Sequence, residues 1–121
     1  MDSPIVQLDH VALQSSDLAG SCAFYANVLN LHPIERPAFS FPGAWFALGP
    51  GQSLHLIQRD TPLVAAHGNH HFAIQVSDFD AWHDHLQSSG VEIKGPQHRP
   101  DGVRQMYIDD PDGHTIEVTG A

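Results

Sequence analysis

The sequence has a single cysteine, few basic residues and no long apolar run. Cys22 has no second cysteine with which to form an internal disulfide, so a reducing, cytoplasmic location is expected. Five Lys and Arg stand against 14 Asp and Glu, a formal net charge of −9 that disfavours nucleic acid and membranes as partners. No stretch approaches the roughly 20 apolar residues of a membrane-spanning helix. The first ten residues also lack the basic and apolar regions of a secretory signal.

The clearest positive feature is an internal repeat. The segment HVALQSSDL at 10–18 returns as HFAIQVSDF at 71–79, so that His, Ala, Gln, Ser and Asp recur after 61 residues. Near the end of each half, SLHLI places His55 where TIEVT places Glu117, after 62 residues. A repeat of this length indicates one domain, 1–121, built from two modules at about 4–60 and about 68–121. The join, DTPLVAAHGN, carries the Pro, Gly and small residues of a linker.

Each module is predicted to begin with a strand, continue with a helix and end with short strands. The first helix is expected to be capped by Ser16 or Asp17 and to run to about Asn30. Asp, Pro, Asp and Gly at 110–113 predict a turn between the last two strands. The predicted strands cover 5–14, 33–37, 43–48, 53–58, 70–76, 91–94, 103–109 and 114–119, and the second helix covers about 79–88.

Strand phase selects among the ten histidines. Side chains of a strand alternate between its two faces, so Val11 and Leu13 share the face suited to packing on a helix. His10 lies on the other face, and His70 has the wrong parity to join it. The same alternation, applied to the four matching strands, puts these side chains opposite the helices: His10, His55, His71 and Glu117.

Three imidazoles and one carboxylate in repeat register predict a site for one divalent metal ion. Imidazole nitrogen suits several transition metals, and a carboxylate adds negative charge and hardness. Ni, Zn, Co, Mn and Fe all remain open on this evidence. A catalytic metal needs positions open to substrate, so the expected partner is a small molecule.

The chain resembles the vicinal oxygen chelate superfamily, which includes glyoxalase I, bleomycin-resistance proteins and extradiol dioxygenases. The resemblance rests on LDHVALQSSDL, FYANVLNL, HFAIQVSD and DPDGHTIEV, and it covers nearly the whole chain. It implies an α+β fold in which two tandem βαβββ modules form a cupped mixed sheet. It also implies a homodimer and a metal bound at the positions of His10, His55, His71 and Glu117.

Within this superfamily, the interpretation we favour is a metal-dependent, glyoxalase-like lyase or isomerase. Its small oxygen-bearing substrate would be chelated on the metal, and Glu117 would move a proton between adjacent carbons. Bacterial-type glyoxalase I usually has Glu where this chain has His55. Replacing that carboxylate with a neutral imidazole makes the site more positive and leaves one proton shuttle.

Two alternatives remain open at this point. An Fe(II) extradiol-type dioxygenase would use His10, His71 and Glu117 as its facial triad, with His98 and Tyr107 as further catalytic residues. A non-catalytic relative of bleomycin-resistance proteins would instead bind its ligand among aromatic side chains. The candidates for such contacts are Phe41, Trp45, Phe46 and Trp82.

Substrate contacts are predicted from the same positions. Trp45 and Phe46 are the favoured aromatic contacts. For an acidic substrate, Arg99 and Arg104 flank the loop 100–102, and Arg104 is the favoured contact.

Overall fold

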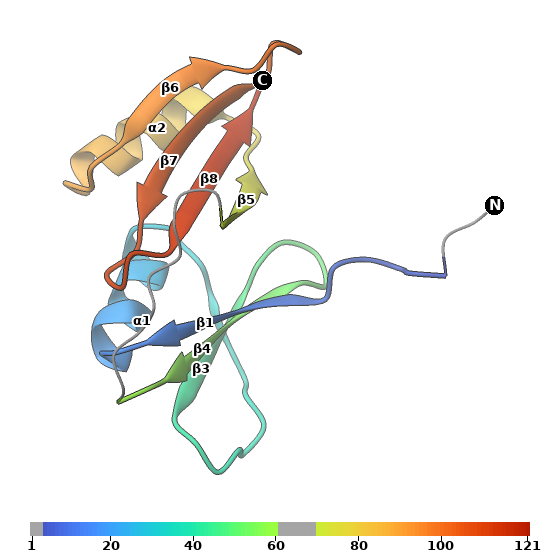
Figure 1. Cartoon of the computed structure of the whole chain (residues 1–121), viewed down its shortest axis with the longest axis vertical. Coiled ribbons are helices and arrows are strands. Elements are labelled where there is room, and N and C mark those ends of the chain that lie inside the picture. The colour runs from blue at the N-terminus through green and yellow to red at the C-terminus, as the bar shows by residue number, and fades with distance from the viewer. Residues whose placement is uncertain (1–3, 61–69) are drawn as a thin grey trace. The chain divides into compact units, whose positions relative to one another are not determined.

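The computed structural model describes residues 4–60 and 70–121, and the chain divides into two compact units, residues 1–61 and 62–121. Each unit contains one helix and one four-stranded mixed sheet (Figure 1). This confirms the predicted α+β class and the strand–helix–strands plan of each half. The predicted linker at 60–69 lies, beyond Asp60, outside the described residues. None of the described helices is long and apolar enough to cross a membrane.

In the chain order of unit 1, the helix follows the first strand and precedes the other three. The sheet order is β1-β4-β3-β2, with β1 and β4 parallel and the other pairs antiparallel. Its core is formed by Leu54 and Leu56 of the sheet with Tyr25 and Leu29, all at most 1% exposed. The elements are β1 (His10–Ser15), α1 (Leu18–Asn27), β2 (Pro33–Ile34), β3 (Gly43–Ala47) and β4 (Ser53–Gln58).

Helix α1 begins at the second of its two predicted caps. The Asp17 carboxylate accepts a hydrogen bond from the Gly20 amide, which would otherwise lack an intrahelical partner. The helix ends at Asn27, three residues earlier than predicted. Asn30 has a φ of 56°, a left-handed conformation that Asn tolerates better than most residues, and the Leu31 amide turns back to the Tyr25 carbonyl.

Two strands of unit 1 are shorter than their alternation predicted. β1 begins at His10 rather than at residue 5, and Ile5, Val6 and Leu8 are 65–95% exposed. Alternation alone therefore overestimated the strand, because these apolar side chains lie exposed and do not form a buried face. β2 extends only over Pro33 and Ile34, instead of 33–37. Proline supplies no amide for a ladder hydrogen bond, which limits pairing at both ends of that segment.

Unit 2 repeats the plan. The sheet order is β5-β8-β7-β6, again with one parallel pair, β5–β8. Helix α2 is capped by the Asp78 carboxylate, which accepts from the Ala81 amide. The core includes Leu86 of the helix with Met106, Ile116 and Val118 of the sheet, all fully buried. The elements are β5 (His71–Gln75), α2 (Phe79–Ser88), β6 (Lys94–His98), β7 (Arg104–Asp109) and β8 (Thr115–Gly120).

The prediction for β6 was wrong in position. The strand covers Lys94–His98 rather than 91–94, and every residue in it is exposed. It lies at the outer edge of the sheet, and its pairing with β7 is irregular between Lys94 and Gln97. A strand that buries neither face carries no alternating apolar signal, so the sequence pattern could not locate it.

The repeat in the sequence is also a repeat in strand register. In the parallel pair of unit 1, His10 lies opposite Ser53, and Ala12 lies opposite His55. In unit 2, His71 lies opposite Thr115, and Ala73 lies opposite Glu117. Each unit therefore places its two candidate ligands in the same relation, two steps apart on adjacent strands and on one face of the sheet.

The loop before β8 forms the predicted turn. One oxygen of the Asp110 carboxylate accepts from the amides of Asp112 and His114, both at 2.9 Å. Gly113 takes a φ of 85°, which glycine adopts without steric strain. This turn sets where β8 begins and therefore the position of Glu117.

Candidate metal centre

In unit 2 the two predicted ligands are in direct contact. His71 Nε2 lies 3.1 Å from Glu117 Oε1, and the Glu117 side chain is only 7% exposed. Two atoms bound to one Zn-like ion at about 2.0–2.2 Å lie roughly 3 Å apart. The two atoms form a hydrogen bond at a separation close to that of two ligands of one metal.

The other oxygen of Glu117 is held by a residue that the sequence analysis did not select. Gln105 Nε2 donates to Glu117 Oε2 at 3.2 Å and approaches the Tyr107 hydroxyl at 3.3 Å. Both carboxylate oxygens are therefore engaged, which fixes the plane of the group. Gln105 shares its strand face with Tyr107 by simple alternation, and that parity was the available signal.

Tyr107, one of the predicted catalytic residues, lies on the same face of the sheet as Glu117. It is directly opposite Glu117 in the β7–β8 register, and its ring meets the His71 ring edge-on at 5.7 Å. Burial raises the pKa of the Tyr107 phenol, and the neighbouring Glu117 carboxylate raises it further. The phenol therefore stays protonated at neutral pH and can donate a hydrogen bond.

In unit 1 the two predicted ligands are in contact through their rings. The rings of His10 and His55 stack with centroids 4.2 Å apart and planes 14° from parallel. His10 Nδ1 lies 2.8 Å from the Asp9 carboxylate, so Nε2 is the ring atom that could bind a metal. A carboxylate behind a histidine is a common way to orient a metal ligand, and Asp9 was not among the predicted residues.

His55 is held on two sides. Its Nε2 lies 2.8 Å from the Ser53 hydroxyl, and its ring is parallel to Trp45 at 3.9 Å. Burial lowers the pKa of His55, and the nearby His10 lowers it further. The imidazole is thus kept neutral, the form in which histidine binds metals.

The donor types suit a divalent ion. Across residues 4–60 and 70–121, no three or more His, Cys, Asp or Glu side chains lie close enough together to hold a metal. Unit 1 instead brings together two imidazoles, and unit 2 brings together an imidazole and a carboxylate. Nitrogen and oxygen donors of these kinds are accepted by Zn, Ni, Co, Mn and Fe.

Three of the predicted site residues lie elsewhere. Phe46 is 2% exposed and packs near Tyr25 in the core of unit 1, on the face opposite Trp45. Arg104 donates to Asp80 at 2.7 Å and to the Ala121 carbonyl, with its guanidinium over the Phe79 ring. His98 pairs with Arg104 and so shares its sheet face, not the face of Glu117. The structure therefore places Arg104 and His98 off the Glu117 face, and Phe46 off the face of Trp45 and His55.

Arg99, rather than Arg104, lies on the Glu117 face. Its amide bonds to the Val103 carbonyl, which by alternation places it on the side of Gln105 and Tyr107. The guanidinium holds Asp101 at 3.1 and 2.5 Å and lowers the pKa of that carboxyl to about 2. The Glu117 carboxylate also raises the pKa of Arg99, although the hydrogen-bonded Asp101 is the larger influence.

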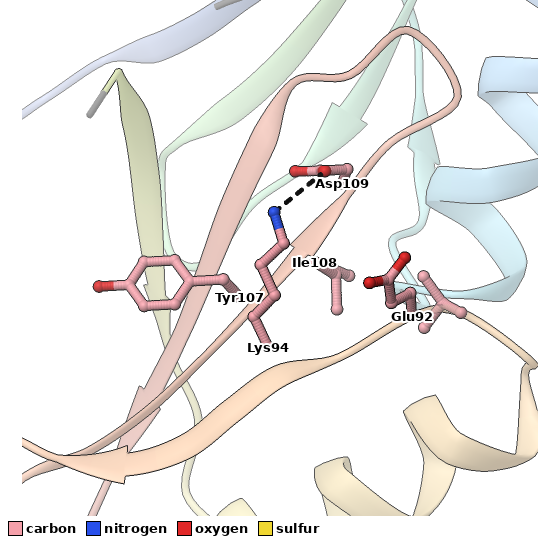
Figure 2. A pocket seen from close by; sticks show the side chains of 6 residues that line it. Glu92, Lys94, Tyr107, Ile108 and Asp109 are labelled. Atoms are coloured by element: carbon pink, nitrogen blue, oxygen red, sulfur yellow. Dashed lines mark ion pairs between the residues drawn. The ribbon is translucent and has the colours of Figure 1, made fainter. Parts of the chain in front are cut away.

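A separate cavity of about 210 Å³ lies between β6 and β7. Figure 2 shows the Lys94 ammonium directed at Asp109, 3.8 Å away, while the Tyr107 hydroxyl points away from both. Tyr107 is one of the residues that line this cavity, whereas its hydroxyl contacts the Gln105 side chain. It is therefore distinct from the Glu117 pair.

The comparisons with known proteins agree with this fold. A family model described as the Glyoxalase/Bleomycin resistance protein/Dioxygenase superfamily matches residues 7–118. The chain belongs to this superfamily, as the sequence motifs indicated.

Similar proteins within it include enzymes of more than one activity. Metallothiol transferase FosB of Staphylococcus epidermidis is 31% identical, over 94% of this chain and 81% of that protein. Glyoxylase I 4 of Arabidopsis thaliana is 27% identical, over 94% of this chain and 70% of its own. The solved fosfomycin resistance protein FosX of Listeria monocytogenes has a TM-score of 0.77 and 26% identity, covering 97% of this chain and 94% of that one.

Proposed function

We propose that the protein is a divalent-metal-dependent lyase or isomerase of the glyoxalase type, acting on a small substrate with adjacent oxygens that chelate the metal. His10, His55, His71 and Glu117 would be the ligands, from one chain or from two chains of a homodimer. The observation that supports this most directly is the 3.1 Å contact between His71 Nε2 and Glu117 Oε1, the two atoms that would share the metal.

Glu117 is the residue proposed to transfer the proton. When bound, the metal would polarise the substrate oxygens and make the neighbouring C–H more acidic. The Glu117 carboxylate would accept that proton and return it to the adjacent carbon. Gln105 holds the carboxylate plane, and the protonated Tyr107 phenol supplies a hydrogen-bond donor at the same face. Asp9 orients His10 in the other unit.

A dioxygenase is the second candidate, and in it His55 would not be a ligand. Its Nε2 lies at the Ser53 hydroxyl and its ring is stacked on Trp45, which leaves only Nδ1 for a metal. Without His55, the remaining His10, His71 and Glu117 form the two-histidine, one-carboxylate set typical of non-haem Fe(II) oxygenases. A ligand-binding protein without turnover is the third candidate.

Metal content is the deciding measurement. Untagged protein purified without oxygen would be analysed for transition metals, beside Glu117→Gln and His10→Ala. The exposed His32, in unit 1, gives the matched control His32→Ala. We expect near-stoichiometric metal in the wild type and in the control, and loss in both ligand variants. Unchanged metal in both ligand variants would refute the ligand assignment.

The identity of the metal then directs the assays. Ni, Zn, Co or Mn supports the lyase or isomerase and calls for hemithioacetals and other α-hydroxy carbonyls. Because the similar proteins include a metallothiol transferase and a fosfomycin resistance protein, fosfomycin with a thiol belongs in the same panel. Near-stoichiometric Fe with oxygen uptake on catechols would replace the lyase by the dioxygenase. Protein that neither carries nor takes up metal would leave only the ligand-binding candidate.

A further inference from the structure

Unit 1 carries a continuous row of rings that ends at its predicted metal ligands. Phe41 stacks on Phe39 at 5.3 Å, and Phe39 lies 6.1 Å from Trp45. Trp45 is parallel to His55 at 3.9 Å, and His55 stacks on His10. The last two rings, His55 and His10, are the predicted metal ligands of this unit. The row formed by Phe41, Phe39 and Trp45, called here the aromatic row, has no role in metal binding.

The outer end of the aromatic row is apolar and faces water. Phe39 and Phe41 are 46% and 42% exposed, in the segment between β2 and β3. Packing these two rings into the core of unit 1 would have been favourable by the usual hydrophobic effect. Instead the chain presents them together, which is typical of a surface that contacts a ligand.

Arg36 places a positive charge on the aromatic row. Its guanidinium carbon lies 4.9 Å from the centroids of both Phe39 and Phe41, and it donates to the Phe41 carbonyl at 2.8 Å. Gly43 makes room for it, since a Cβ there would lie 3.0 Å from the guanidinium and closer still to the Leu56 carbonyl. The arginine is thus held by rings and backbone.

Arg36 differs in its partners from three of the other four Lys and Arg residues. Lys94, Arg99 and Arg104 each form an ion pair with an aspartate. Within the described part of the chain, Arg36 forms no ion pair with a carboxylate. In a protein of net charge −9, a fixed cation held against two exposed rings is a distinctive feature. A guanidinium is well suited to binding a planar carboxylate.

We propose that the aromatic row binds the aromatic ring of a small molecule that also carries a carboxylate. The ring would lie against Phe39 and the face of Trp45 turned away from His55, and the carboxylate would pair with Arg36. Because Trp45 would then lie between the bound ring and His55, this is a binding site separate from the predicted metal ligands. An aromatic carboxylic acid such as mandelate has this combination of groups.

The two tryptophans allow a direct test by fluorescence. Trp45 belongs to the aromatic row, whereas Trp82 lies in α2 beside His85. Trp82→Phe leaves Trp45 as the single reporter in the full-length chain. Its emission would be titrated with mandelate, with lactate, which lacks the phenyl ring, and with methyl mandelate, which lacks the charge. The titrations would use both metal-loaded and chelator-treated protein.

We expect mandelate to bind at least tenfold more tightly than lactate and than methyl mandelate. Arg36→Gln should remove the advantage over the ester, and Phe39→Ala should weaken mandelate without affecting lactate. Arg59, exposed in the same unit, supplies the control Arg59→Gln, which should change nothing. Circular dichroism identifies any variant that fails to fold, and Arg36→Lys then tests the charge with less disturbance.

Equal affinity for mandelate and lactate would overturn the proposal, as would an Arg36→Gln variant that still prefers the acid to its ester. The chelator-treated titration keeps this test separate from the metal assignment. Mandelate binding in metal-free protein supports the aromatic row even if His10 and Glu117 prove not to bind metal. Metal binding without a preference for mandelate refutes the aromatic row alone.

Discussion

The two units share one strand register but hold their candidate ligands by different physical means. In unit 2, His71, Glu117, Gln105 and Tyr107 are linked mainly by hydrogen bonds around a carboxylate that is 7% exposed. In unit 1, His10 and His55 are held chiefly by ring stacking, and the His10 side chain is 44% exposed. The same backbone frame therefore supports an oriented, buried carboxylate in one half and an aromatic surface in the other.

This difference follows from one ligand position. Where unit 2 has Glu117, a carboxylate that must be hydrogen-bonded when buried, unit 1 has His55, whose flat ring can stack on Trp45. The partner residues differ accordingly, an amide and a phenol beside the carboxylate and an indole beside the imidazole. The repeated fold thus fixes the strand positions of the candidate ligands, whereas the contacts that hold them differ between the two halves.

The largest expected effects are on the two cores, which should respond alike if the units are equivalent scaffolds. Leu54 and Ile116 are fully buried at matching positions of β4 and β8. Leu54→Ala and Ile116→Ala should each lower the free energy of unfolding by about 2–5 kcal/mol, because each leaves a cavity. Urea denaturation measures the loss, and hydrogen exchange assigns it to a unit.

The exposed Val6, at 95%, provides the apolar control Val6→Ala, expected to change stability by less than about 0.5 kcal/mol. A core variant that behaved like this control would show that its unit is not packed as described. Unequal losses in the two units would instead show which half limits the stability of the chain.

Metal affinity should distinguish the two halves most clearly. Glu117→Gln removes the negative charge while keeping the shape of the side chain. We expect the metal dissociation constant to rise by roughly 100-fold or more, because loss of a residue that only orients a ligand already costs about 10- to 100-fold. His55→Gln should have a smaller effect, about 10-fold on the same scale, since Ser53 and Trp45 already engage the ring. Isothermal titration with Zn or Ni measures both.

Glu92→Gln, at an exposed position of unit 2, controls for the general loss of negative charge. If His55→Gln proved as damaging as Glu117→Gln, the two halves would contribute equally and the four-ligand site would be favoured over the three-ligand one. No change in either variant would remove both residues from the ligand set.

The helix caps offer a smaller, closely matched comparison. Asp17 accepts from Gly20 at 3.3 Å, and Asp78 accepts from Ala81 at 3.1 Å. Asp17→Ala and Asp78→Ala should each cost about 1 kcal/mol, with Asp78 the larger because its hydrogen bond is shorter. Thermal denaturation measures the difference. Asp84→Ala, inside α2, should not destabilise, because Ala favours the helix interior.

The smallest expected effect concerns the Arg99–Asp101 pair. The guanidinium lowers the pKa of Asp101 from 3.8 to about 2, so the folded protein binds this proton less readily than the unfolded chain. The resulting stabilisation is present above pH 3.8 and is lost as the pH falls through about 2. The melting temperature of Asp101→Asn should therefore lie slightly below wild type at neutral pH and converge with it near pH 2. A constant gap across this range would exclude the pair as its cause.

The sequence predicted those parts of the fold that bury one face. The phase of Leu54 and Ile116, the helix over 79–88 and the Asp110 turn were all correct, because burial and capping each require particular residue types. β6 was misplaced because a fully exposed strand needs no apolar alternation. The beginning of β1 was predicted too early because Ile5, Val6 and Leu8 alternate without being buried.

For the candidate site, the sequence located ligand types but not the residues that hold them. The contacts of His71 with Glu117 and of His10 with His55 follow from strand parity in a repeat. Asp9 and Gln105 orient these groups through single hydrogen bonds that depend on rotamers, which no periodicity encodes. Phe46 and Arg104 were predicted from residue type alone. Their positions in the alternation of β3 and β7 were not considered, and these positions place both side chains on the helix-covered faces.

The outer strand β6 has a consequence for how the protein behaves at high concentration. An exposed sheet edge offers unpaired amides and carbonyls to any passing chain, which is how many proteins begin to form insoluble fibres. Here that edge carries the charged Lys94 and also Pro96, which has no amide proton to donate. The pairing of β6 with β7 is also irregular between Lys94 and Gln97. These features make β6 a poor template for a further strand, so this side of unit 2 is protected against uncontrolled self-association.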